Sequence, residues 1–163
     1  MIVTDVGLLK FAQVIRKFLL TKSTLNLAMN AVVVYFSRTG NTKQLAQAIA
    51  DTAKAPLLEL TQAEPAKVAA YDLLIFGTPV EGASPTKEAL AYVQSLSTVT
   101  GKKAILFCTY KLFGNERAMK AVEKELSTKG YETILRVSKK GMKPGEADFS
   151  KVIKEVKSAL EKY

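Results

Sequence analysis

Five short apolar runs, spaced along residues 31–163, constrain the fold of this chain more than any other feature. They lie at 31–36, 56–60, 71–76, 103–108 and 133–137. Amphipathic stretches with apolar residues at helical spacing occupy 41–53, 85–96, 115–129 and 148–160. Strands that alternate with helices are joined by right-handed crossovers, which give a parallel sheet with helices on both faces. Five strands, rather than six, favour a single α/β domain with a doubly wound sheet in the order 2-1-3-4-5.

The composition excludes several kinds of catalytic site. The 163 residues, 48% apolar and 24% charged, suit one globular domain with a substantial core. There is no histidine, which excludes histidine-dependent triads, histidine metal sites and histidine acid–base catalysis. The single cysteine, Cys108, rules out a disulfide framework, and its apolar neighbours predict a small core residue rather than a redox thiol. A redox or hydrolytic function therefore has to rely on a bound cofactor.

The chain is basic, with a net charge of +9. Residues 31–163 alone hold 20 basic and 14 acidic side chains, a net charge of +6. Such a balance suits an acidic protein partner, an anionic cofactor or nucleic acid, and the alternative is a solvated lysine-rich surface.

Residues 1–30 differ from the rest and are predicted to be an N-terminal extension of a domain at 31–163. Basic residues interrupt the segment, so it is neither a membrane span nor a convincing secretory signal, and the cytoplasm is the expected location. Three interpretations stay open: a helix packed on the domain, a basic amphipathic helix that seeks surfaces, or a leader from a start codon assigned too early, since Met29 directly precedes the first strand. The apolar residues at helical spacing are Leu8, Phe11, Ala12, Ile15, Phe18 and Leu19.

The loop between the first strand and the first helix has the composition of an anion site. In this sheet order, ligands bind beyond the carboxyl ends of the first and third strands, where the strand order reverses. The loop supplies backbone N–H groups at a helix N-terminus, three hydroxyls, one amide and a glycine that lets an oxyanion approach, but no acid. It is neither a Walker A nor a G-x-G-x-x-G sequence, and the alternative to a phosphate site is an ordinary polar helix cap. Its residues are Ser37, Arg38, Thr39, Gly40, Asn41 and Thr42.

Three segments resemble the flavodoxin family in order and separation. "YFSRTGNTKQLAQAIA" is similar to its phosphate loop, and "YDLLIFGTPVEGASP" resembles its third strand and first flavin loop. "AILFCTYKLFGNERAMKAVEKELSTKGYE" resembles the fourth strand, second flavin loop and following helix. The resemblance covers residues 31–163 and implies a flavodoxin-like fold that binds FMN non-covalently and carries electrons at low potential.

The resemblance also implies which residues hold the cofactor. Residues 37–42 would bind the FMN phosphate, and two further loops would hold the flavin. In this family, a peptide of the first flavin loop turns its carbonyl toward flavin N5 when the semiquinone is protonated. Glu81–Gly82 is the candidate for that peptide, although Gly82 can also be an ordinary turn glycine. The first loop comprises Thr78, Pro79, Val80, Glu81, Gly82 and Ala83, and the second comprises Thr109, Tyr110, Lys111, Phe113 and Gly114.

The sequence departs from the family pattern in two ways. The first flavin loop has no aromatic residue, so stacking on the flavin falls to Tyr110, or to Phe113 unless that ring is a buried loop anchor. One flavin face would then meet only Val80 and backbone. The chain is also basic, with lysines expected near the flavin rim, and this predicts a less negative hydroquinone potential and acidic redox partners. These lysines are Lys111, Lys139, Lys140 and Lys143.

Three functions compete on this pattern. The first is a one-electron carrier that uses FMN. The second is an NAD(P)H-dependent flavin or quinone reductase, which an uncovered flavin face suits but a short domain without an obvious insertion does not. The third is a binding module, for example for nucleic acid, and the intact phosphate loop and the lack of interleaved aromatic residues argue against it.

Overall fold

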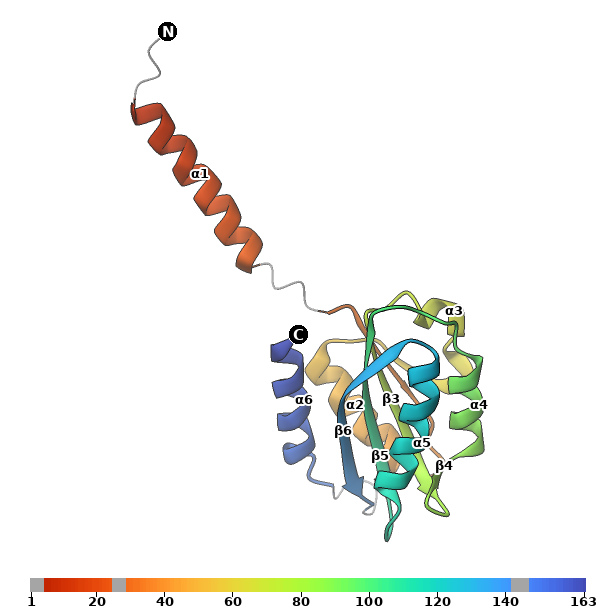
Figure 1. Ribbon diagram of the computed structural model, residues 1–163. Helices are drawn as coiled ribbons and strands as arrows, with labels where there is room; N and C mark the ends of the chain where they lie inside the picture. The colour runs from red at the N-terminus through yellow and green to blue at the C-terminus, as the bar shows by residue number, and fades with distance from the viewer. Residues whose placement is uncertain (1–4, 25–28, 142–146) are drawn as a thin grey trace.

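The computed structural model describes residues 5–24, 29–141 and 147–163. Its strands are β1 (Ala31–Tyr35), β2 (Leu57–Glu59), β3 (Leu73–Glu81), β4 (Ser84–Pro85), β5 (Lys102–Tyr110) and β6 (Tyr131–Lys140). The parallel strands follow the order β2-β1-β3-β5-β6, and the short β4 pairs antiparallel with the end of β3 (Figure 1). Counted along the chain, the parallel strands have the predicted order 2-1-3-4-5, which confirms the fold class.

Helices cover both faces of this sheet, as predicted (Figure 1). One pair packs on each face, so alternate strand residues enter two separate cores. Helices α2 (Asn41–Ala53) and α6 (Ser150–Lys162) pack on the face that holds Val33. Helices α4 (Lys87–Ser95) and α5 (Asn115–Thr128) pack on the face that holds Val34. Burial on both faces explains why the strands are continuous apolar runs rather than alternating ones.

The strands extend further toward their carboxyl ends than the apolar runs predict. β3 continues past Phe76 to Glu81, because its backbone pairs with β5 as far as Pro79. β5 and β6 likewise pair beyond their apolar runs. Backbone pairing needs no apolar side chain, so the sequence pattern ends before the strand does.

Two helix starts differ from the prediction. Pro85 belongs to β4, and α4 begins after Thr86, whose hydroxyl accepts a hydrogen bond from the Ala89 N–H at 3.2 Å. α6 begins at Ser150, where the backbone N–H donates to the Asp148 carboxylate at 2.9 Å. Two short elements between β2 and β3, a 3-10 turn η1 (Leu60–Gln62) and α3 (Pro65–Val68), were not predicted.

A helix, α1 (Asp5–Thr24), precedes the sheet and stands apart from it in Figure 1. The side chains of residues 6–17 are exposed, so this part of α1 is not a helix packed on the domain. None of the helices in the described residues is long and apolar enough to cross a membrane. The division into an extension and a domain stays a prediction.

Cys108 lies near the carboxyl end of β5 and is fully buried, which confirms the expected core role. Burial, followed by the negative charge of the nearby Glu116 carboxylate, raises the pKa of its thiol to about 12. Because the thiolate is the reactive form, a buried thiol with this pKa is inert at neutral pH.

We therefore expect Cys108 in the native protein to resist thiol reagents. At pH 8, modification by 5,5′-dithiobis(2-nitrobenzoate) should proceed only as fast as the protein unfolds. The same protein in guanidinium chloride should react completely and provides the control. Rapid stoichiometric labelling of the native protein would show that the thiol is accessible and ionised.

Candidate functional site

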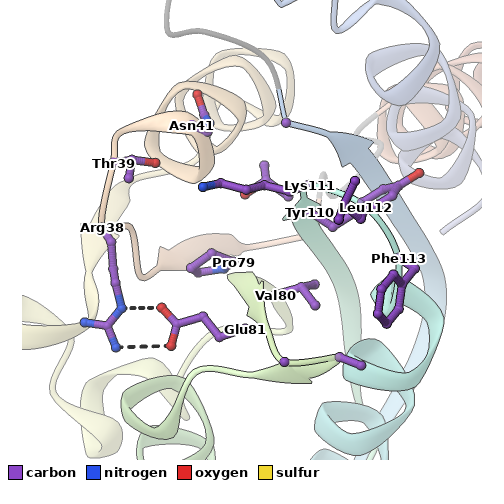
Figure 2. A pocket seen from close by; sticks show the side chains of 14 residues that line it. Arg38, Thr39, Asn41, Pro79, Val80, Glu81, Tyr110, Lys111, Leu112 and Phe113 are labelled. Carbon is purple, nitrogen blue, oxygen red and sulfur yellow. Dashed lines mark hydrogen bonds and ion pairs between the residues drawn. The ribbon is translucent and has the colours of Figure 1, made fainter.

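A cavity of about 460 Å³ lies beyond the carboxyl ends of β1, β3 and β5. Three loops that are far apart in the sequence form its walls, as Figure 2 shows. Twelve of the predicted site residues line it. They are Arg38, Thr39, Asn41, Pro79, Val80, Glu81, Gly82, Ala83, Thr109, Tyr110, Lys111 and Phe113. Leu112 and Gly141 line it too and were not predicted.

The phosphate loop, residues 37–42, leads directly into α2. Gly40 is the residue before the helix, with φ of 96°, a conformation that favours glycine. Its N–H donates to the Ser37 hydroxyl at 3.1 Å, and no other group lies within 4 Å of the place where a Cβ would sit. The first turn of α2 has no acidic residue. The loop therefore presents open backbone and a helix N-terminus, the arrangement that attracts an anion.

Thr42 and Thr78 are predicted site residues that the structure places behind the cavity wall. The Thr42 hydroxyl lies 2.7 Å from that of Thr109 and is buried, which joins the phosphate loop to the end of β5. The Thr78 hydroxyl donates to the Pro79 carbonyl at 2.9 Å and lies 3.4 Å from the Thr86 hydroxyl. In this arrangement both threonines support the loops rather than line the cavity.

The first flavin loop, residues 78–83, ends in a tight hairpin between β3 and β4. Glu81 pairs with Ser84 across a two-residue turn of Gly82 and Ala83, which have φ of 57° and 61°. Positive φ at both central residues is typical of a type I′ turn. The hairpin was not predicted, because an alanine in this left-handed conformation is unusual and the segment carries no Asn-Gly or Asp-Gly signal.

The second flavin loop, residues 109–114, touches this hairpin. A Cβ on Gly114 would lie 2.5 Å from the Ala83 Cα, so the two loops meet where only glycine fits. Gly114 also has φ of 93° and precedes α5. Although it does not line the cavity, it fixes how closely the two flavin loops approach each other.

The side chains at the tip of the second flavin loop are exposed. Leu112 is 77% and Phe113 is 72% exposed, so Phe113 is not a buried loop anchor. Tyr110 is half-buried and lines the cavity, and its stacking on a flavin stays a prediction. In Figure 2, the Lys111 side chain extends toward the side of the cavity where Thr39 and Asn41 lie.

Arg38 connects the phosphate loop to the first flavin loop and to α4. Its guanidinium forms a two-pronged ion pair with Glu81 (Figure 2). It lies 3.0 Å from both carboxylate oxygens of Glu88. It also lies 5.1 Å from the centre of the Phe36 ring. The hydrogen bonds that Arg38 donates to the carboxylate of Glu81 and then to that of Glu88 raise the pKa of Arg38. Sequence reasoning missed these pairs, because the acids follow Arg38 by 43 and 50 positions.

The predicted lysines at the end of β6 lie beside the cavity rather than in its wall. Lys139 is paired with Thr109 and Lys140 with Tyr110 in the sheet register. Both line a small hollow next to the phosphate loop, together with Asn41. Lys143, predicted to lie near the flavin rim as well, falls outside the described residues.

A model of the flavodoxin domain matches residues 32–136, more than half of the chain. The chain belongs to the flavodoxin family. FMN is the cofactor of this family, as the sequence resemblance implies.

The chain is also similar to known proteins in sequence and in fold. An uncharacterised protein of Methanocaldococcus jannaschii is 29% identical over 65% of this chain and 71% of its own length. The flavodoxin of Streptococcus pneumoniae TIGR4 superposes with a TM-score of 0.67 at 18% identity, over 80% of this chain and 94% of that one. Rubredoxin oxygen:oxidoreductase of Desulfovibrio gigas superposes with a TM-score of 0.64 at 15% identity, over 80% of this chain but 34% of that one. The flavodoxin-like fold therefore also occurs as a part of a larger oxidoreductase.

The residues around the cavity fit FMN. The acid-free N-terminus of α2 lies at one side, whereas Pro79, Val80, Leu112 and Phe113 supply apolar surface elsewhere in the wall. A ligand with an anionic end and a flat apolar end matches this division. A cavity of about 460 Å³ also lies within the usual range for small-molecule sites, roughly 300–1,000 Å³.

The contact between the flavin loops can be tested by replacing Gly114. Gly114→Ala introduces a methyl group against Ala83 in a backbone conformation that disfavours alanine. Gly101→Ala is a matched control, because Gly101 has φ of 68° but nothing within 4 Å of its Cβ position. Each variant carries about 1–2 kcal/mol of backbone strain, and Gly114→Ala should lose a further ~1–3 kcal/mol from overpacking. Urea denaturation measures the two losses, and equal losses would contradict the close approach of the loops.

Proposed function

We propose that this flavodoxin binds FMN in the cavity between its three loops and acts as a low-potential one-electron carrier. The observation that supports this best is the convergence of the phosphate loop and both flavin loops on one cavity beside an acid-free helix N-terminus. When bound, FMN supplies the electron-transfer chemistry, and the protein supplies binding, orientation and electrostatics.

The phosphate loop would hold the anionic end of the cofactor. Thr39, Asn41 and the backbone N–H groups of the α2 N-terminus face this side, and the Lys111 side chain extends toward it (Figure 2). The Arg38 guanidinium is instead engaged by Glu81 and Glu88. We infer that Arg38 holds the loops in place, whereas Lys111 supplies positive charge to the cavity.

The two flavin loops would hold the isoalloxazine. Pro79 and Val80 offer a flat apolar wall on one side, and Tyr110 is the candidate for stacking on the other. Gly82 can change backbone conformation cheaply, so the Glu81–Gly82 peptide keeps the role proposed for it. Because Arg38 holds the Glu81 side chain, a rotation of this peptide would be confined to the backbone of the turn.

The surface around the cavity suits an acidic redox partner. Leu112 and Phe113 are exposed at the cavity mouth beside Lys111, and apolar side chains next to a cation form a docking surface for an acidic protein. The cytoplasm remains the expected location of this exchange.

A second candidate is an NAD(P)H-dependent flavin or quinone reductase. It is favoured by the first flavin loop, which lines the cavity with Pro79 and Val80 and offers no aromatic cover. A nicotinamide or quinone ring could stack on a flavin face left open in this way.

Binding of FMN at the phosphate loop predicts a specific effect of Gly40→Ala. The added methyl group meets no protein atom within 4 Å, so the apoprotein should lose only about the same stability as Gly101→Ala. The methyl group would, however, occupy the open backbone where we place the phosphate, and the affinity for FMN should fall at least about tenfold, or ~1.4 kcal/mol. Titration with FMN by fluorescence quenching measures the affinity. Equal FMN affinities for Gly40→Ala and Gly101→Ala would place the phosphate elsewhere.

The carrier and the reductase differ in their response to NADPH. We expect stepwise anaerobic reduction of the FMN-loaded protein with dithionite to pass through a stable one-electron-reduced form. We also expect the protein to consume no NADPH in the presence of quinone or free flavin. Rapid NADPH consumption without a stable one-electron-reduced form would favour the reductase. Absence of any FMN uptake would overturn both candidates.

A further inference from the structure

α1 exposes an unusual amount of apolar surface. Nine large apolar or aromatic side chains are strongly exposed in the described residues, and six of them lie on this one helix, with exposed fractions of 42–65%. Single exposed apolar side chains are common, but a contiguous group indicates a surface that binds something. The six are Val6, Leu8, Leu9, Phe11, Val14 and Ile15.

Three of the six side chains share a face that lies opposite two of the basic residues of α1. Leu8, Phe11 and Ile15 follow the spacing i, i+3, i+7 and therefore share one side of the helix. Lys10 and Lys17 lie seven residues apart on the opposite side. We call the Leu8–Phe11–Ile15 side the apolar face of α1.

The positive charge of residues 1–30 favours an anionic surface as the partner of α1. Residues 1–30 carry four basic side chains and one acidic side chain, a net charge of +3, and the whole chain carries +9. A second copy of the chain is equally basic and would be repelled, whereas an anionic lipid surface would be attracted. A basic helix with leucine and phenylalanine on its apolar side is typical of helices that lie in the plane of a membrane surface.

We propose that α1 binds the surface of an anionic phospholipid bilayer. The apolar face of α1 enters the boundary between headgroups and acyl chains, and Lys10 and Lys17 contact the headgroups. At 20 residues, the helix is about 30 Å long, enough to lie along the surface.

The attachment point of α1 leaves the cavity accessible. α1 precedes β1 in the chain, so it joins the sheet at the amino end of that strand. The carboxyl ends of the strands lie at the edge of the sheet away from α1 (Figure 1). The cavity is lined by residues at these carboxyl ends and in the loops that follow them. Membrane binding through α1 would therefore hold the protein at a bilayer without covering the cavity. This inference does not depend on the proposed electron-transfer function.

The test is flotation of the full chain with vesicles of equal amounts of phosphatidylglycerol and phosphatidylcholine. We expect the chain to float with these vesicles and not with pure phosphatidylcholine. The variant Leu8→Ser/Phe11→Ser/Ile15→Ser should bind at least about tenfold more weakly, because three large apolar side chains no longer leave water. Since these side chains are exposed in the structure, its unfolding midpoint should match that of the parent.

The role of charge is tested with two matched variants. Lys10→Gln/Lys17→Gln should weaken binding to the anionic vesicles about thirtyfold, because about 1 kcal/mol is lost for each of the two cations near the surface. Lys154→Gln/Lys157→Gln removes the same charge from exposed positions on α6 and should leave binding nearly unchanged. Equal effects of the two variants would overturn the specific role of α1.

Two further outcomes would also overturn the proposal. The first is a parent chain that does not float with anionic vesicles. The second is a parent chain that self-associates in analytical ultracentrifugation and loses this property in the triple serine variant, because a second copy would then cover the apolar face of α1.

Discussion

Backbone pairing of β3 with both β1 and β5 is the constraint on which the site depends. In the register, Tyr35, Gly77 and Phe107 lie at one level across the three strands. A Cβ on Gly77 would lie 2.0 Å from the Phe107 ring, so the glycine makes room for that ring at the centre of the sheet. Because the three strands are aligned at this level, the loops that follow them emerge side by side and enclose one cavity.

Each pair of these three loops is joined by one direct contact. The buried Thr42–Thr109 hydroxyl pair joins the phosphate loop to the second flavin loop. Arg38 joins the phosphate loop to the first flavin loop through Glu81. The close approach of Gly114 to Ala83 joins the two flavin loops. A site closed in this way is largely formed before a ligand arrives, and less binding energy is spent on ordering loops.

The sequence predicted the features that depend on local patterns. Helical spacing located α2 and α5, and the hydroxyl-rich composition of residues 37–42 located the loop at the α2 N-terminus. It could not predict contacts between residues that only the fold brings together, such as Arg38 with Glu81. It also placed strand ends too early, because Thr78 and Thr109 are polar although they are paired and buried. The exposure of Phe113 depends on the conformation of the loop tip, which the residue type alone does not predict.

Nearby carboxylates offset part of the positive charge around the cavity. Arg38 forms ion pairs with Glu81 and Glu88. The pKa of Glu88 is lowered by a hydrogen bond from its own backbone N–H and then by Arg38. Lys139 lies close enough to Asp148 to help lower the pKa of that carboxyl, after the hydrogen bonds from Ser150. Carboxylates thus offset the charge of Arg38 and part of that of Lys139, and Coulomb interactions with a bound anion fall with distance. Among the described cations, Lys111 lines the cavity and extends toward the phosphate loop, so it should contribute most to the electrostatic potential that FMN experiences.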